Sequence, residues 1–139
     1  EIQKKSLAWS VGRASLEEID HLNIREAAFL AMRRALNALT QPAEWVLCDG
    51  FELKHIATPC TKMIKGDAHS RSIAAASILA KVARDQAMTE ADLLYPMYHF
   101  SVHKGYGTKK HSDALKKHGP CILHRQSFAP IKLLRGDTV

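Results

Sequence analysis

Apolar residues recur at helical spacing in two long stretches, and a proline follows closely behind each of them. The first stretch runs from Asn23 to about Leu39, and its opening residues have the spacing of a capping box. The second starts at Ser70 or Ser72, either of which can cap a helix, and continues toward Leu94. The pattern therefore predicts two long helices that end before the prolines.

Shorter apolar patterns predict strands. Residues 6–14 alternate between apolar and polar positions, which favours a strand. Residues 45–48 form an apolar run that stops at Asp49, as a buried strand does, and residues 55–59 with 61–65 give a second, weaker strand. The first long predicted helix thus lies between two of the three predicted strands.

Five further segments complete the pattern. Residues 1–5 resemble the end of an amphipathic helix, and Ser15 begins a capping box that predicts a short helix. Residues 99–108 are typical of a Gly-rich loop, residues 112–117 of a last short helix, and the remaining tail of an irregular basic segment. Strands interleaved with helices predict an α/β fold, and the lack of repeats or linkers predicts one domain over residues 1–139.

Charge and cysteine content narrow the class of protein. The chain has 20 Lys and Arg against 14 Asp and Glu, which gives a net charge of +6 and a pI near 9.4. This balance favours a polyanionic partner, nucleic acid first, although a generally basic surface explains it equally well. Three widely separated cysteines favour reduced thiols and a cytoplasmic protein. No apolar run approaches the roughly 18 residues of a membrane span.

Two carboxylates are the first candidates for chemistry. Asp49 follows a predicted strand, and Asp67 lies between a predicted strand and a predicted helix. Neighbouring strands lie about 4.8 Å apart, so acids at their ends can share a metal site. Mg²⁺ prefers oxygen ligands of this kind. Asp-Gly is also a common turn pair, and an acid at a helix start also caps the helix, so both structural alternatives stay open.

A loop and a tail combine cations with aromatic residues. His103, Lys104 and Tyr106 lie in a loop with two glycines, which let the backbone approach a ligand closely. Lys104 can meet a phosphate, and Tyr106 can stack on a sugar or base. The tail adds His124 and Arg125 as two phosphate donors, followed by an aromatic anchor. An ordinary surface loop and a solvated tail are the structural alternatives.

Taken together and in this order, the motifs resemble bacterial ribonuclease HII from about residue 6 to residue 132. The matching segments are Leu22-Asn23-Ile24, residues 31–35, Cys48-Asp49-Gly50, Lys65-Gly66-Asp67, residues 72–85, residues 103–108 and residues 124–130. The resemblance implies an RNase H-like fold, a mixed sheet flanked by helices. It also implies endonucleolytic cleavage of RNA in RNA/DNA hybrids, including ribonucleotides embedded in duplex DNA. Mg²⁺ or Mn²⁺ is the implied cofactor, and DNA repair and replication are the implied setting.

The resemblance also implies roles for single residues. Asp49 and Asp67 match the third and fourth acidic metal ligands of the family, which are catalytic residues. An Asp in the fourth position favours ribonuclease HII over the related ribonuclease HIII, which has Glu there. Tyr106 matches the tyrosine that stacks on a sugar near the RNA-to-DNA junction. The further substrate contacts expected are Ser72, His103, Lys104 and Arg125.

One part of the family pattern has no counterpart in these 139 residues. The family's first strand carries an Asp-Glu pair, which supplies the first two metal ligands, and a Gly-Arg-Gly turn that reads the 2′-hydroxyl. We therefore expect an incomplete domain without its first strands, and little or no ribonuclease activity from this chain alone. It is expected to pair with the missing N-terminal segment or with a second copy. The alternative function is non-catalytic nucleic-acid binding through Lys104, Tyr106 and Arg125, with no membrane partner.

Overall fold

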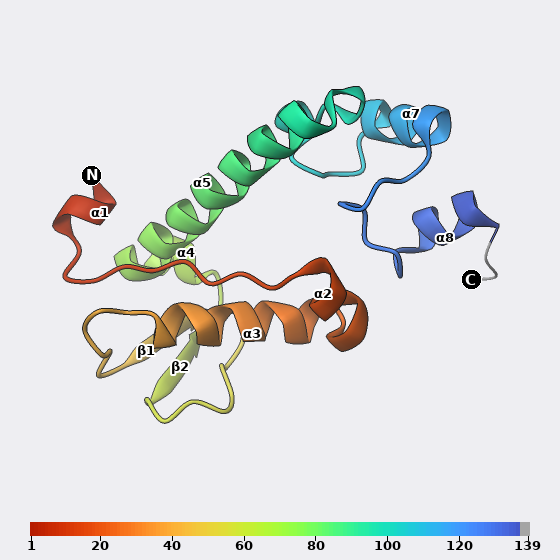
Figure 1. Ribbon diagram of the computed structural model, residues 1–139. Coiled ribbons are helices and arrows are strands. Elements are labelled where there is room, and N and C mark those ends of the chain that lie inside the picture. The colour runs from red at the N-terminus through yellow and green to blue at the C-terminus, as the bar shows by residue number, and fades with distance from the viewer. Residues whose placement is uncertain (137–139) are drawn as a thin grey trace. The chain divides into compact units, whose positions relative to one another are not determined.

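Helices and two short strands make up two units, Glu1–Lys81 and the part from Val82 onward, each of which is described by itself. The structure is a computed structural model that describes residues 1–136 (Figure 1). The elements in chain order are α1 (Ile2–Lys5), α2 (Leu16–Leu22), α3 (Ile24–Asn37), β1 (Val46–Asp49), β2 (Cys60–Met63), α4 (Gly66–His69), α5 (Arg71–Leu94), the 3₁₀ turn η1 (Pro96–Tyr98), α6 (Phe100–His103), α7 (Lys109–His118) and α8 (Ala129–Arg135). The single domain over residues 1–139 stays a prediction.

Side-chain caps fix where α2 and α3 begin. The Ser15 hydroxyl accepts a hydrogen bond from the backbone N–H of Glu18, and the Glu18 carboxylate accepts one from the N–H of Ser15. This reciprocal pair is the capping box that the sequence predicts. The side chain of Asn23 accepts hydrogen bonds from the backbone N–H groups of Arg25 and Glu26, in the first turn of α3. Both predicted helices are therefore confirmed, and their starts follow from the capping residues.

The strand predicted over residues 6–14 is wrong. This segment runs alongside α3 without forming a regular element. The Ser10 hydroxyl donates a hydrogen bond to the Ala35 carbonyl. Gly12 lies so close to the helix that a Cβ there would fall 1.9 Å from the carbonyl oxygen of Ala31. A strand needs a neighbouring strand for its backbone hydrogen bonds, and within residues 1–136 this segment contacts a helix instead.

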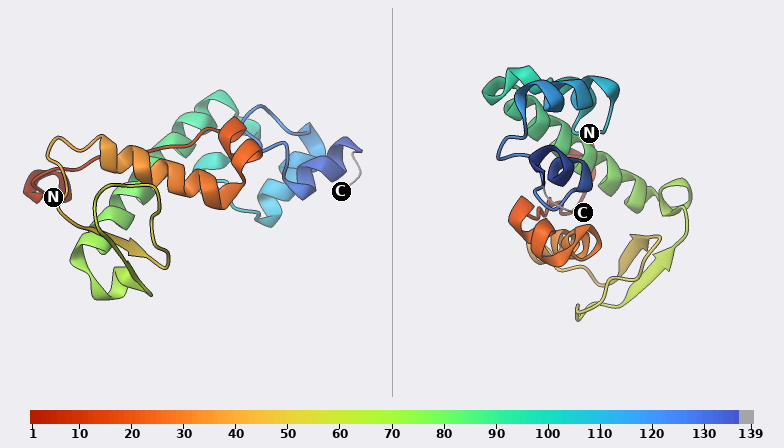
Figure 2. Two further views of the ribbon diagram at one scale, coloured as in Figure 1. Left: turned by 90° about the horizontal axis from the view of Figure 1, so that it is seen from below. Right: turned by 90° about the vertical axis from the view of Figure 1, so that its right-hand side faces the viewer.

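The sheet of the first unit is a pair of parallel strands, seen side by side in the right-hand view of Figure 2. The pairing runs from Val46 opposite Cys60 to Asp49 opposite Met63. Cys48 is buried in one cluster with Phe29 and Leu53, so an apolar face of α3 packs near β1. The strand predicted over residues 45–48 is confirmed as β1. Of the weaker strand predicted over residues 55–59 and 61–65, β2 confirms the second part, whereas residues 55–59 form no strand.

The long helix α5 takes its start from Ser70. The Ser70 hydroxyl accepts a hydrogen bond from the N–H of Ile73, and its carbonyl accepts the first helical hydrogen bond, from Ala74 at 2.9 Å. Ser70, rather than Ser72, is therefore the cap. The helix ends at Leu94, before the proline, as predicted. Neither α5 nor any other helix within the described residues is long and apolar enough to cross a membrane.

The core of the second unit is aromatic. Tyr98 and Phe100 are each 3% exposed, their rings stack at 5.3 Å, and Ile131 joins the same cluster. These buried side chains explain two errors of the sequence pattern. Part of the predicted 99–108 loop forms α6, because Phe100 must be buried, and the predicted irregular tail forms α8, which carries Ile131 into the core. The predicted 112–117 helix is confirmed as α7, which is longer at both ends.

Candidate functional site

Asp49 and Asp67 lie on segments that a hydrogen bond joins at the end of the sheet. One carboxylate oxygen of Asp49, the last residue of β1, accepts a hydrogen bond of 2.8 Å from the backbone N–H of Gly66. Asp67 follows directly, in the first turn of α4. Gly50 extends the strand pairing, because its N–H donates to the Met63 carbonyl at 2.8 Å. The backbone thus brings both acid-bearing segments to one edge of the sheet.

The turn that carries Asp67 is closely packed. Lys65 adopts the left-handed conformation, with φ at 53°. A Cβ on the buried Gly66 would lie 2.5 Å from Cδ1 of Ile73 and 3.3 Å from Cβ of Met63. Only glycine fits at this point without displacing its neighbours. The position of the Asp67 backbone is therefore set by packing between β2, α4 and the start of α5.

The two carboxylates are the right type of ligand for a hard divalent cation, but two are too few to complete its coordination shell. Both side chains belong to exposed residues, and neither forms an ion pair within residues 1–136. Carboxylate oxygens are ligands that Mg²⁺ and Mn²⁺ prefer. Among the described residues, however, no group of three or more His, Cys, Asp or Glu side chains is placed to hold a metal ion. The acids provide only part of a coordination shell.

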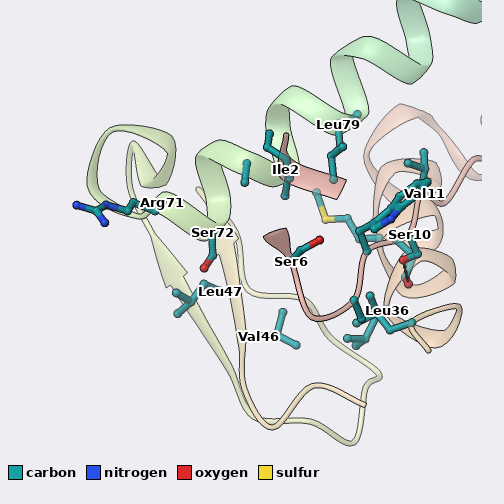
Figure 3. A pocket seen from close by; sticks show the side chains of 18 of the residues that line it. Ile2, Ser6, Ser10, Val11, Leu36, Val46, Leu47, Arg71, Ser72 and Leu79 are labelled. Carbon is teal, nitrogen blue, oxygen red and sulfur yellow. Dashed lines mark hydrogen bonds between the residues drawn. The ribbon is translucent and has the colours of Figure 1, made fainter. Parts of the chain in front are cut away.

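Ser72 lies at a cavity of the first unit that neither acid lines. The cavity has a volume of about 980 Å³, and mostly apolar side chains from α1, α3, β1 and α5 surround it. In Figure 3, Ser72 projects into this space near Leu47, whereas the side chain of Arg71 points away. No hydrogen bond among the described residues joins Ser72 to Asp49 or Asp67. Its contact with substrate stays a prediction.

Tyr106 is 61% exposed, yet hydrogen bonds hold it at three points. Its N–H donates to the His103 carbonyl at 2.9 Å. Its carbonyl accepts from the Thr108 N–H at 2.8 Å and lies 3.0 Å from Nδ1 of His111. Its hydroxyl accepts from the Arg84 guanidinium at 2.7 Å, and that guanidinium lies 5.1 Å from the ring centroid. An exposed ring ordered in this way loses little conformational entropy when it stacks on a ligand.

Arg84 is a residue of this site that the sequence did not reveal. It forms an ion pair with the neighbouring Asp85, with a nitrogen–oxygen distance of 3.0 Å. Its contact with Tyr106 spans 22 residues and leaves no local signal in the sequence. The hydrogen bonds that Arg84 donates to Tyr106 and to Asp85, in that order of effect, raise its pKa, so its guanidinium stays charged beside the exposed ring.

Tyr106 and Arg125 line one cavity of the second unit, which has a volume of about 550 Å³. Phe128 contributes to the same lining, and the Arg125 guanidinium lies 5.2 Å from its ring centroid. The structure therefore brings the predicted loop and tail together. Lys104 does not line this cavity, and its left-handed backbone, with φ at 52°, ends α6.

Two histidines of the predicted site are inside the core. His103 is 5% exposed, its Nε2 lies 2.7 Å from the Tyr98 carbonyl, and its Nδ1 accepts a hydrogen bond from the N–H of Gly105. His124 is 6% exposed. The aromatic core buries the His124 ring, and a phosphate contact by this residue stays a prediction. A direct substrate contact by His103 stays a prediction, while its observed contacts support the loop from beneath.

Comparisons with known proteins agree with the resemblance seen in the motifs. The family model for ribonuclease HII matches residues 1–131. A protein named ribonuclease HII from Vibrio vulnificus (strain YJ016) is 49% identical over 136 residues, which cover 98% of this chain and 66% of that protein. One from Desulforamulus reducens is 48% identical over 134 residues, or 96% of this chain and 68% of the relative. The chain spans about two thirds of the length of these curated relatives.

A solved structure shows the same fold. The crystal structure of the ribonuclease H2 from Pyrococcus horikoshii OT3 matches with a TM-score of 0.70, over 88% of this chain and 65% of that one, at 20% identity. The predicted α/β fold, with its sheet flanked by helices, is confirmed. The fold, the family model over nearly the whole chain and relatives of nearly half identical sequence lead to one conclusion: the chain belongs to the ribonuclease HII family.

Proposed function

We propose that this chain contributes to a cytoplasmic endonuclease that cleaves the RNA strand of RNA/DNA hybrids, including ribonucleotides embedded in duplex DNA. The observation that carries the proposal is the hydrogen bond from the Gly66 N–H to Asp49, which places Asp67 at the edge of the sheet where Asp49 ends β1. Family membership supports the reaction class, hydrolysis of a phosphodiester that leaves a 5′-phosphate and a 3′-hydroxyl.

Asp49 and Asp67 are the proposed ligands of Mg²⁺ or Mn²⁺. Two bound divalent ions supply an activated water and stabilise the charge on the leaving 3′-oxygen. Asp49 keeps its orientation through the Gly66 N–H, and Asp67 keeps its place through the close packing of the same glycine. Two acids cannot complete a two-metal site. We propose that the other carboxylates come from outside these 139 residues, from the part of the relatives that the chain does not cover or from a second copy.

The second unit carries further proposed substrate contacts. Tyr106 is proposed to stack on a sugar or base, since its exposed ring is already ordered by Arg84 and by the backbone of its loop. Arg125 and Lys104 are proposed to meet phosphates. Ser72 of the first unit is proposed as a further contact. These cations belong to a chain with a net charge of +6, which favours any nucleic-acid duplex before specific contacts form.

A second candidate function is nucleic-acid binding without cleavage. The observation that favours it is the separation of roles along the chain. The ordered Tyr106 and the cavity that it shares with Arg125 lie in a unit that contains neither Asp49 nor Asp67. Binding through this unit would therefore survive the loss of either acid, and metal-dependent cleavage would not.

Metal binding and cleavage are to be measured separately on the purified 139-residue chain. We expect Mn²⁺ to broaden the NMR signals of residues around Asp49 and Asp67, and Asp49→Asn to remove this effect. Asp113→Asn, at an exposed acid of α7, is the matched control and should leave the broadening unchanged. Absence of local broadening in the unsubstituted chain would refute the assignment of the metal ligands.

Cleavage is tested on a duplex that contains a single ribonucleotide, in Mg²⁺ and in Mn²⁺. We expect little or no product from this chain alone, and binding of the same duplex in EDTA that Asp49→Asn leaves intact. Robust Mg²⁺-dependent cleavage by the chain would show that its own two acids suffice, and would contradict the proposed need for further carboxylates.

A further inference from the structure

A chain of hydrogen bonds connects the C-terminal tail to the backbone of Tyr106 through two histidine rings. The N–H of Cys121 donates to Nδ1 of His124 at 3.0 Å. The Nε2 atoms of His124 and His111 lie 3.1 Å apart. Nδ1 of His111 lies 3.0 Å from the Tyr106 carbonyl oxygen. Both rings are buried, with His111 7% and His124 6% exposed.

The backbone groups at the two ends of this chain fix where the ring protons lie. The Cys121 N–H can only donate, so Nδ1 of His124 accepts and the proton of that ring is on Nε2. This proton points at Nε2 of His111, which therefore accepts. The proton of His111 is then on Nδ1 and is donated to the Tyr106 carbonyl, which can only accept. All donors and acceptors match when both rings are neutral.

The surroundings of the two rings disfavour a positive charge on balance, because burial outweighs the hydrogen bond to the Tyr106 carbonyl, which favours the charged form of His111. His103 from α6 stacks on His111 at 4.2 Å, and the Cys121 thiol lies 3.2 Å from Nδ1 of His124. The other titratable or charged groups nearby are Tyr98, whose ring meets His124 and His118, and Arg125, the next residue in the chain. Within the described residues no carboxylate is hydrogen-bonded to either ring. Burial first, and then the neighbouring histidines, lower the pKa of both rings.

We propose that His111 and His124 are a positioning pair that ties the Tyr106 backbone to the C-terminal tail, and so positions Tyr106 for substrate stacking, only while both rings are neutral. The proposal rests on the proposed role of Tyr106 as the stacking residue. A second proton on His111 would set its Nε2–H against the Nε2–H of His124. A second proton on His124 would set its Nδ1–H against the Cys121 N–H. Either event breaks the connection and frees the loop from the tail.

This pair predicts a pH dependence of opposite sign to that of simple charge attraction. Protonation of histidines raises the positive charge of the protein and strengthens phosphate binding, so a purely electrostatic binder gains affinity as pH falls. If the histidine pair positions Tyr106, the contribution of stacking is lost over the same range. The difference between the chain and its Tyr106→Ala variant isolates that contribution, since both carry the same eight histidines.

The test measures binding of a short fluorescein-labelled RNA/DNA hybrid in EDTA, by fluorescence anisotropy, from about pH 8 down to about pH 5, the range in which imidazoles titrate. At the upper end we expect His111→Phe to weaken binding about tenfold, because one hydrogen bond to the loop is worth about 1.4 kcal/mol. His111→Asn retains a donor near the Nδ1 position and should stay within about threefold of the unsubstituted chain. His21→Gln, at an exposed histidine of α2, is the control and should change nothing.

The outcomes separate this proposal from the function on which it rests. If Tyr106→Ala leaves binding unchanged, the proposed stacking role is wrong. If Tyr106→Ala weakens binding but His111→Phe does not, the positioning pair is wrong and the proposed function stands. Long-range proton–nitrogen NMR spectra of the unsubstituted chain give a test that needs no variant to fold. A proton on Nε2 of His111, or on Nδ1 of His124, near neutral pH would overturn the proposal.

Discussion

The two units hold their candidate functional residues by different means. In the first unit, Asp49 is tied to the backbone N–H of Gly66, and the turn is fixed by a glycine that leaves no room for a side chain. In the second unit, the carbonyl of Tyr106 is hydrogen-bonded to the ring of His111, which in turn is hydrogen-bonded to the ring of His124. A backbone N–H does not titrate near neutral pH, whereas an imidazole does. We therefore expect the backbone positions of Asp49 and Asp67 to stay the same over a pH range in which the position of the Tyr106 loop changes.

The largest effect is expected at the glycine beneath the acids. Gly66→Ala would place a Cβ 2.5 Å from Cδ1 of Ile73, and we expect it to lower the free energy of unfolding by about 1–3 kcal/mol. It should also weaken Mn²⁺ binding, because Asp67 follows directly. Urea unfolding and Mn²⁺ titration measure the two effects.

Gly107→Ala is the matched control for this substitution, since nothing lies within 4 Å of a Cβ there. We expect it to leave the free energy of unfolding nearly unchanged. Equal stability of the Gly66 and Gly107 variants would show that the turn can relax, and that packing does not hold the acids in place.

We expect a fall in pH to destabilise the second unit before the first. Burial lowers the pKa of His111 and His124, so the unfolded chain binds more protons than the folded one once pH falls below the unfolded value of about 6.5. The stability contribution is thus complete above that value and is lost as pH falls through the folded pKa values. Each excess proton costs about 1.4 kcal/mol per pH unit. Amide signals from α7 and the tail should disappear first in NMR spectra, and a uniform loss over both units would contradict the contrast.

The sequence predicted features that depend on local chemistry. The capping box at Ser15 and the strand that ends at Asp49 follow from neighbours within a few residues, and both are confirmed. Residues 6–14 alternate like a strand but contact α3, because alternation describes an extended backbone and not its partner. Ile131 shows the same limit. The sequence of the basic tail does not predict α8, because the helix depends on burial of Ile131 in the aromatic core.

Within the candidate site, the two acids could be predicted and the histidines could not. Asp49 and Asp67 each follow a strand, and parallel strands bring such positions together. The sequence offers His124 as one of two possible phosphate donors in the tail, but its ring is buried. Its actual partner, His111, lies 13 residues earlier on another element. A histidine in a loop carries no local mark of burial, so its role depends on tertiary contacts that no short motif encodes.

A smaller effect is expected at Arg84, which contacts the exposed Tyr106 ring from outside its loop. Arg84→Gln and Tyr106→Phe both remove the hydrogen bond between guanidinium and hydroxyl. We expect each to weaken hybrid binding by about 0.5–1.5 kcal/mol. The double variant should lose less binding free energy than the sum of the two single losses. Its loss should lie closer to the larger single loss, because the two residues act through a shared contact. Fully additive losses in anisotropy titrations would mean that Arg84 acts on substrate independently of Tyr106.

The smallest effect is expected where a side-chain contact lies at the surface of the first unit. The Glu18 carboxylate accepts hydrogen bonds from Arg34 at 2.6 and 2.7 Å, and this contact, followed by that with Ser15, lowers the pKa of Glu18 to about 2. Its contribution is complete above the unfolded value of about 4.3 and is lost as pH falls through the folded one. Solvent and salt screen such a pair, so Glu18→Gln should lower Tm only slightly near neutral pH, and less in high salt.

The Glu18 variant therefore tests whether burial is what distinguishes the two kinds of attachment. Gln retains an acceptor for the Ser15 N–H, so the comparison removes charge and leaves most of the capping box. Calorimetric scans at neutral pH and near pH 2 would show the difference between the chain and its variant vanish in acid. If Glu18→Gln lowered Tm as much as Gly66→Ala, the exposed ion pair would contribute as much to stability as the close packing at Gly66. The acids of the first unit would then depend on titratable side chains, as Tyr106 does.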